Sequence, residues 1–271
     1  MQEIQKEWGI LSRDPWLRPF AEAIDARMQA LRDTRRRLLP HRQSLTAFAT
    51  GHLYYGFQRT RTGWVYREWA PAAEAVHLIG DFNGWDRTSH PLTPIGDGNW
   101  EITLKGVRTL PHGSRVKVQI TAGGQTFDRI PLYIKRVVQD PENGGFDGQI
   151  WSPARQYVWK HPVPDRKRQP PLLIYECHIG MATEEGKVGT FAEFTRDVLP
   201  RIHKDGYTAI QIMAVMEHPY YASFGYQVTN FFAVSSRFGT PEELKALIDT
   251  AHGMGIAVLL DVIHSHACRN T

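Results

Sequence analysis

The sequence predicts a multidomain chain in which an N-terminal helical segment (1–48) is followed by an antiparallel β-sandwich (49–160) and by the first three βα units of an α/β barrel (161–271). Apolar residues recur at intervals of three and four in the first segment, which is typical of an amphipathic helix. Short strands bounded by turn residues follow. Strand and helix patterns then alternate, which indicates a parallel sheet.

The N-terminal segment has the features of a helix start. Asp14 is a suitable cap, and Pro15 suits the first helical turn. The apolar positions of the predicted helix lie on one face, which we expect to pack against another surface: Leu17, Phe20, Ala21, Ile24, Met28 and Leu31. Arg35, Arg36 and Arg37 come next, and two interpretations stay open: a solvated basic helix end, or a contact with phosphate or glucan.

Residues 49–160 have the texture of a β-sandwich. Trp64, Tyr66 and Glu68 alternate with Val65, Arg67 and Trp69, and further strands are expected at 75–79, 100–104 and 116–120. The turn Gly80-Asp81-Phe82-Asn83-Gly84 presents Trp85. The indole of Trp85 either closes one end of the sandwich or binds a sugar face.

Residues 160–171, KHPVPDRKRQPP, combine proline with charge and carry few apolar side chains, so we place a domain boundary there. Beyond it, strands are expected at 172–175, at 209–215 and in the final apolar run. The capping boxes Thr190/Glu193 and Thr240/Glu243 are each expected to begin a helix that connects two consecutive strands. The order β-α-β-α-β predicts a parallel sheet with right-handed crossovers.

The final stretch, GIAVLLDVIHSH, reads as a strand buried on both faces. Asp261, His264 and His266 follow this strand, as Glu176 and His178 follow the first. These groups should meet the aromatic-rich loop 216–239 at the carboxyl edge of the sheet, where barrels place their chemistry. Rings, imidazoles and carboxylates together favour a polyhydroxylated ligand.

Metal ligation by Asp261, His264 and His266 is the alternative to hydrogen-bonding histidines. No further ligand of suitable spacing is visible, so we expect neither a metal nor another cofactor.

Composition excludes several classes of protein. A net charge of +4 over 271 residues does not indicate nucleic-acid binding. No apolar run approaches membrane-spanning length, and the N-terminus lacks the apolar core of a signal peptide. Cys177 and Cys268 have no metal-binding spacing and are expected to be free thiols. The sequence therefore predicts a soluble, cytoplasmic protein.

Five segments together carry a family resemblance. The ending DVIHSH resembles the first signature region of the α-amylase clan of glycoside hydrolases and transferases, in the form found in 1,4-α-glucan (glycogen) branching enzymes. Four further segments agree: ASFGYQVTNFFAVSSRFGTPEELKALID, LLIYECHIGMA, YREWAPAAEAVHLIGDFNGWD and DPWLRPFAEAIDARM. The resemblance implies a carbohydrate-binding module for the sandwich and a (β/α)8 TIM barrel for the remainder.

The resemblance implies roles for particular side chains. His266 is similar to the imidazole that hydrogen-bonds the glucose next to the scissile bond, Asp261 to the carboxylate that braces that subsite, and Tyr226 to the ring that stacks under the same glucose. In the module, Trp85 is similar to the glucan-packing tryptophan, and Lys117 would be its polar partner. The partner implied is an α-1,4-glucan such as amylose or glycogen.

Enzymes of this clan work by retaining double displacement, with one carboxylate as nucleophile and a second carboxyl group as acid and base. In the family those groups follow later barrel strands, so the resemblance places them beyond Thr271. Glu176, Glu217 and Asp261 do not match them, and we assign no catalytic residue in this chain. The chain alone is therefore expected to be inactive.

The main functional hypothesis is the N-terminal portion of a branching enzyme of glycogen biosynthesis. Two alternatives stay open: a non-catalytic glucan-binding fragment, and a debranching hydrolase of the same clan. Net release of reducing ends from glycogen would favour the hydrolase.

Overall fold

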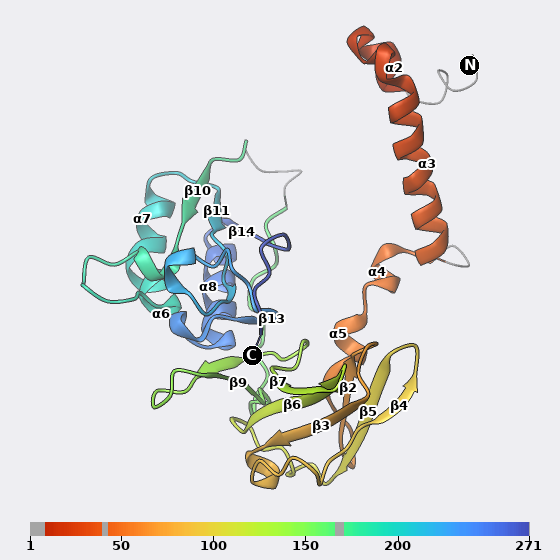
Figure 1. The fold of residues 1–271 in the computed structure, drawn as a ribbon. Helices are drawn as coiled ribbons and strands as arrows, with labels where there is room; N and C mark the ends of the chain where they lie inside the picture. The colour runs from red at the N-terminus through yellow and green to blue at the C-terminus, as the bar shows by residue number, and fades with distance from the viewer. Residues whose placement is uncertain (1–8, 40–42, 166–170, 271) are drawn as a thin grey trace. The chain divides into compact units, whose positions relative to one another are not determined.

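The computed structural model describes residues 9–39, 43–165 and 171–270, and these divide at Leu53/Tyr54 into two compact units (Figure 1). The predicted boundaries at 48/49 and 160/161 stay predictions. Residues 166–170 of the expected linker, and Thr271, lie outside the described residues.

The first unit is helical. Its elements are α2 (Gly9–Arg13), the 3-10 turn η1 (Pro15–Phe20), α3 (Ala21–Leu38), α4 (Leu45–Phe48) and the start of α5 (Gly51–Tyr54). Asp14 caps η1, and its carboxylate accepts a hydrogen bond from the amide of Trp16 at 3.0 Å. No residue of α3 is buried, and Phe20 and Leu31 are 60% and 58% exposed. The contact expected for this apolar face is therefore not made within the unit.

The second unit begins with a β-sandwich, as predicted. One antiparallel sheet has the order β1 (Gly56–Arg59), β2 (Gly63–Trp69), β5 (Asn99–Lys105), β4 (Thr93–Gly96). The other has the order β3 (Ala75–Gly80), β6 (Arg115–Ala122), β9 (Phe146–Gln149), β8 (Val137–Gln139), with β7 (Gln125–Arg129) beside β6. The alternation in β2 places Trp64, Tyr66 and Glu68 inward, where all three are buried.

The barrel portion contains a three-stranded parallel sheet in the order β10 (Ile174–Cys177), β11 (Ala209–Ile212), β14 (Ala257–Leu260). The crossovers contain α6 (Phe191–Glu193), a π-helical turn (Phe194–Val198), α7 (Leu199–Lys204) and α8 (Pro241–Gly253). Both expected capping boxes are present. The π turn ends beside Pro200, which has no amide hydrogen to continue the regular ladder.

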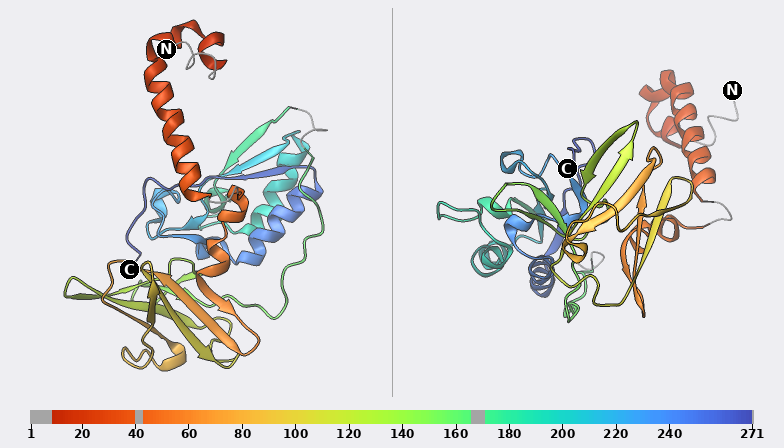
Figure 2. Two further views of the ribbon diagram at one scale, coloured as in Figure 1. Left: turned by 90° about the vertical axis from the view of Figure 1, so that its right-hand side faces the viewer. Right: turned by 60° about the horizontal axis from the view of Figure 1, so that its bottom comes forward.

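The helices cover one face of this sheet, and their apolar residues pack on Ile210 and Ile212 (Figure 2). The expectation that the last strand is buried on both faces was wrong, because Leu260 is 43% exposed. Among the described residues, β14 pairs on one side only and the opposite face of the sheet has no helical layer.

The long loop 216–239 is not irregular throughout. It contains an antiparallel hairpin of β12 (Met216–Glu217) and β13 (Asn230–Val234), with 3-10 turns at Tyr221–Ser223 and Ser236–Phe238. A parallel bridge joins Val234 to Arg136, and the Arg136 guanidinium donates to the carbonyl of Gly239 at 2.8 Å. The hairpin therefore connects the barrel sheet to the sandwich.

Candidate functional site at the carboxyl edge of the parallel sheet

Asp261 is held from two sides at the end of β14. Its Oδ2 accepts a hydrogen bond from the Tyr226 hydroxyl at 3.0 Å, and its Oδ1 accepts one from the Gln211 amide at 2.9 Å. The Asp261 backbone amide donates to the carbonyl of Ile212 at 3.1 Å, which continues the parallel pairing by one residue. The carboxylate is therefore fixed in direction by β11 and by the long loop.

Tyr226 reaches Asp261 because of the turn that precedes it. Gly225 has φ +84°, and a Cβ atom there would lie 2.0 Å from the carbonyl oxygen of Ala214. Only glycine permits both this conformation and this close approach. The amide of Tyr226 donates to the carbonyl of Ser223 at 2.9 Å, which closes the turn.

The electrostatics keep Tyr226 a hydrogen-bond donor. Burial raises the pKa of its phenol, and the hydrogen bond and charge of Asp261 and the charge of Glu176 raise it further. Glu176 belongs to β10, which lies on the far side of β11 from β14, so this strand also supplies a carboxylate. The phenol stays neutral near pH 7 and holds the orientation of Asp261.

His266 is not part of this arrangement. It lies in an exposed turn, and within the described ranges no hydrogen bond or ring contact joins it to Tyr226 or Asp261. His264 stacks on Phe231, with ring centroids 5.4 Å apart and planes at 15°. Within the described part of the chain, no group of three His, Cys, Asp or Glu side chains is placed to hold a metal ion.

Glu217 is fully buried and braces the loop. Its carboxylate accepts hydrogen bonds from the Ser236 amide at 2.8 Å and the Ser235 hydroxyl at 3.1 Å, and Arg237 lies 3.5 Å away. Burial raises the pKa of Glu217 despite these partners. Its oxygens face the backbone and serine hydroxyls of the loop, so this carboxylate stabilises the loop conformation.

Two buried imidazoles lie beside the site. His178 contacts the rings of Tyr221, Phe224 and Phe238 edge-on, with centroids 5.4–5.9 Å apart. Burial, followed by the neighbouring His218, lowers the pKa of His178. Burial also lowers the pKa of His218, whose Nδ1 lies 2.9 Å from the carbonyl of Met216. Both rings are neutral near pH 7, and His178, which follows β10, packs against the aromatic side chains of the loop.

The sandwich residues singled out by sequence lie at one end of the β3–β6 pair. The Trp85 indole donates to Asp81 at 3.1 Å, and Asp81 also accepts from the amide of Arg115 at 2.7 Å. Lys117 on β6 forms an ion pair with Asp147 at 3.4 Å. Trp85 and Lys117 are both partly exposed, and no direct contact joins them in the described structure.

Sequence reasoning did not identify Gln211. The available signal was its position, because a single amide in the apolar run of a buried strand requires a polar partner. The sequence alone does not say which partner that is. The register of β11 against β14 supplies it, by placing Gln211 opposite Leu259, two residues before Asp261.

Two family models match the chain. Residues 54–141 match carbohydrate-binding module 48 (isoamylase N-terminal domain), and residues 181–271 match the α-amylase catalytic domain. The chain thus joins a module of the first family to the start of a catalytic domain of the second.

Curated relatives decide between members of the clan. The 1,4-α-glucan-branching enzyme of Dictyostelium discoideum is 49% identical over 266 residues, which cover 96% of this chain and 39% of that protein. The enzyme 2-2 of Arabidopsis thaliana, chloroplastic/amyloplastic, is 49% identical over 97% of this chain and 33% of its own length. The chain belongs to the branching-enzyme family. It spans about two fifths of the length of the first of these branching enzymes.

Solved structures share the fold of this branching-enzyme chain. A pullulanase from Bacillus acidopullulyticus matches with TM-score 0.62 at 21% identity, covering 79% of this chain and 30% of the other. Pullulanase type I from Bacillus subtilis, complexed with maltose, matches with TM-score 0.63 at 22% identity, covering 77% of this chain and 32% of the other. At these identities the likeness concerns fold alone.

Proposed function

We propose that this chain is the N-terminal portion of a 1,4-α-glucan branching enzyme. The whole enzyme cleaves an α-1,4-glucan and transfers the cut chain to a 6-hydroxyl by retaining double displacement. The observation that carries the proposal is the fixed Tyr226–Asp261 pair at the carboxyl edge of the sheet. It occurs in a chain that is 49% identical to named branching enzymes along almost its whole length.

In this proposal Tyr226 and Asp261 form one wall of the donor subsite. The Tyr226 ring stacks under the glucose next to the scissile bond, and the braced Asp261 carboxylate accepts its hydroxyls. His266 completes the subsite once a glucan is bound and the exposed turn that carries it closes. Strands that follow β14 supply the nucleophile and the acid/base carboxyl group.

The sandwich is proposed to bind amylose or glycogen through Trp85, with Lys117 as its polar neighbour. Its support is the match to the carbohydrate-binding module and the partial exposure of the indole.

A reducing, cytoplasmic location is also proposed, because Cys177 and Cys268 are both free thiols. No described helix is long and apolar enough to cross a membrane.

The deciding experiment incubates the whole protein with amylose and measures α-1,6 linkages by proton NMR, together with reducing ends. Branching gives new α-1,6 linkages, and the number of reducing ends after the reaction equals the number before it. A rise in reducing ends without new α-1,6 linkages would establish the hydrolase alternative. Absence of both, with glycogen binding retained, would establish the binding-only alternative.

Tyr226→Phe tests the site within this assay. Loss of the hydroxyl removes one of the two bonds that orient Asp261, and we expect the transfer rate to fall about tenfold or more. Tyr220→Phe is the matched control, because Tyr220 is 59% exposed and its hydroxyl has no partner in the described residues. Equal rates for the two variants would remove the Tyr226–Asp261 pair from the donor subsite.

A further inference from the structure

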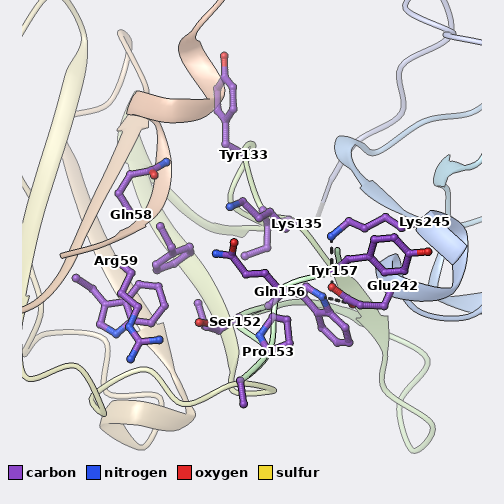
Figure 3. Close-up of a pocket in the computed structure, with 16 residues that line it drawn as sticks. Gln58, Arg59, Tyr133, Lys135, Ser152, Pro153, Gln156, Tyr157, Glu242 and Lys245 are labelled. Atoms are coloured by element: carbon purple, nitrogen blue, oxygen red, sulfur yellow. Dashed lines mark hydrogen bonds and ion pairs between the residues drawn. The ribbon is translucent and has the colours of Figure 1, made fainter. Parts of the chain in front are cut away.

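A cavity lies on the sandwich side of α8, away from the carboxyl edge. It has a volume of about 450 Å³ and is lined by β1, the start of β2, residues 133–135, residues 150–157 and the first turns of α8 (Figure 3). Neither Tyr226 nor Asp261 lines it. Its volume lies within the range of small-molecule sites.

The walls of this cavity are held by directed contacts. The Trp151 indole donates to Glu242 at 2.7 Å, and the Tyr157 hydroxyl donates to Asp249 at 2.8 Å. Both acceptors belong to α8, so the segment after the sandwich is fastened to the helix across the cavity. The cavity is therefore a built feature of this unit.

Its charge is predominantly positive. Arg59, Lys135 and Lys245 line the cavity, against the single carboxylate of Glu242. Glu242 already accepts from Trp151 and pairs with Lys245 at 3.4 Å. Arg59 lies 6.0 Å from the Trp64 ring, and no described carboxylate forms an ion pair with Arg59 or Lys135. Arg59 and Lys135 are therefore exposed cations with no ion-pair partner among the described residues.

The faces of two aromatic rings that line the cavity already contact other side chains of the protein. Tyr133 stacks between Tyr55 and Phe232, with centroids 5.1 and 4.3 Å away. Trp151 carries the Arg136 guanidinium 4.9 Å from its ring centroid. Stacking of a neutral pyranose is therefore not the interaction that this cavity offers. Its available groups are the cations and polar side chains such as Gln156.

We propose that this cavity binds a phosphorylated sugar, either free or as a phosphate-bearing glucose of an α-glucan. Either Arg59 or Lys135 meets the phosphate, because guanidinium and ammonium groups form charge-assisted hydrogen bonds with phosphate oxygens. Ser152 and Gln156 face the sugar hydroxyls, and the remaining volume accommodates a group larger than phosphate. This inference does not depend on the branching reaction.

The test measures binding to the whole protein by isothermal titration calorimetry. The probes are glucose 6-phosphate, glucose, a phosphate-bearing maltodextrin and the neutral maltodextrin of the same length. Arg59→Ala and Lys135→Ala are compared with Arg61→Ala and Lys105→Ala, which remove exposed cations outside the cavity. Melting temperatures of all four variants report on folding.

We expect at least one phosphorylated probe to bind, with about tenfold weaker affinity in one of the two cavity variants and unchanged affinity in both controls. Binding of glucose 6-phosphate identifies a free metabolite, whereas binding of the phosphate-bearing maltodextrin alone identifies phosphate on the glucan. Equal binding of the neutral probes, equal loss in the control variants, or no binding of either phosphorylated probe would overturn the proposal.

Discussion

The Tyr157 hydroxyl lies 2.8 Å from a carboxylate oxygen of Asp249, and this contact fastens the segment after the sandwich to helix α8. The amides of Lys160 and His161 donate to the same carboxylate at 3.1 and 2.9 Å. Asp249 is only 2% exposed, although it belongs to a helix whose other polar residues are mostly partly exposed. One buried carboxylate therefore positions a crossing segment that has little apolar surface of its own.

Asp249 should make stability depend on acid. Burial opposes its ionisation, but the hydrogen bonds from Tyr157, Lys160 and His161 outweigh burial and lower its pKa from 3.8 to about 2. Because the pKa of Asp249 is lower in the folded state, its ionised carboxylate stabilises the folded protein at pH values above the unfolded-state pKa. This stabilisation is lost as pH falls from 3.8 towards 2. The melting-temperature difference between the native protein and Asp249→Asn should shrink across that interval. A constant difference would contradict this assignment.

Tyr157 should act at the opposite end of the pH scale. Burial, with the hydrogen bond and charge of Asp249, raises the pKa of its phenol from 10.0 to about 12. The stabilisation is complete below pH 10 and is lost as pH rises towards 12. Tyr157→Phe should lower the melting temperature by about 5 °C at neutral pH. The melting temperature of the variant should also fall less steeply between pH 10 and pH 12 than that of the native protein. A pH series of thermal melts measures this.

Gly225→Ala should displace Tyr226. The new Cβ would meet the carbonyl of Ala214 at 2.0 Å, in addition to about 1–2 kcal/mol for a left-handed backbone. Gly206→Ala is the matched control, because Gly206 has φ +85° with no atom within 4 Å of the added carbon. We expect a larger loss of melting temperature and of transfer rate for Gly225→Ala. Equal effects would show that backbone strain alone matters.

Trp85→Ala should weaken glycogen retardation in a native gel, since it removes the partly exposed ring of the sandwich turn. Trp159→Ala, which removes a 50% exposed indole outside this turn, is the control. The hydrogen bond from Trp85 to Asp81 is lost as well, so thermal melts must accompany the gels. Unchanged mobility with an unchanged melt would remove Trp85 from the glucan-binding residues.

Residues 1–271 prepared alone should self-associate. Among the residues that the structure describes, the outer strands β10 and β14 each pair on one side only. Ile174, Leu260 and Val262 are 44%, 43% and 56% exposed. Unpaired apolar edges are templates for further strand pairing. Sedimentation velocity over a concentration series measures this. Val262→Lys should reduce the association, and a monomer at every concentration would contradict the prediction.

Much of the local structure was predictable because its causes are local. The capping boxes at Thr190 and Thr240 begin their helices as expected, and the alternating run from Trp64 to Trp69 forms strand β2 as expected. The position of Asp261 after an apolar strand placed it at the carboxyl edge. Each of these features depends on spacing within about ten residues, which a sequence displays directly.

The pairings within the site were not readable in this way. Gln211 and Asp261 are 50 residues apart, and Tyr157 and Asp249 are 92 apart. Their contacts require strand register and helix rotation, which only the packed chain sets. The same holds for His266, whose exposure results from the path of the chain after β14.

The sequence by itself determined the order of the modules, the parallel sheet and the family, because periodicity and motif spacing are properties of short segments. The tertiary structure decided which groups orient Asp261, how Tyr157 and Asp249 fasten the crossing segment, and which exposed cations line a cavity. Those outcomes depend on long-range packing, in which each side chain finds its partner only after distant elements have been brought together.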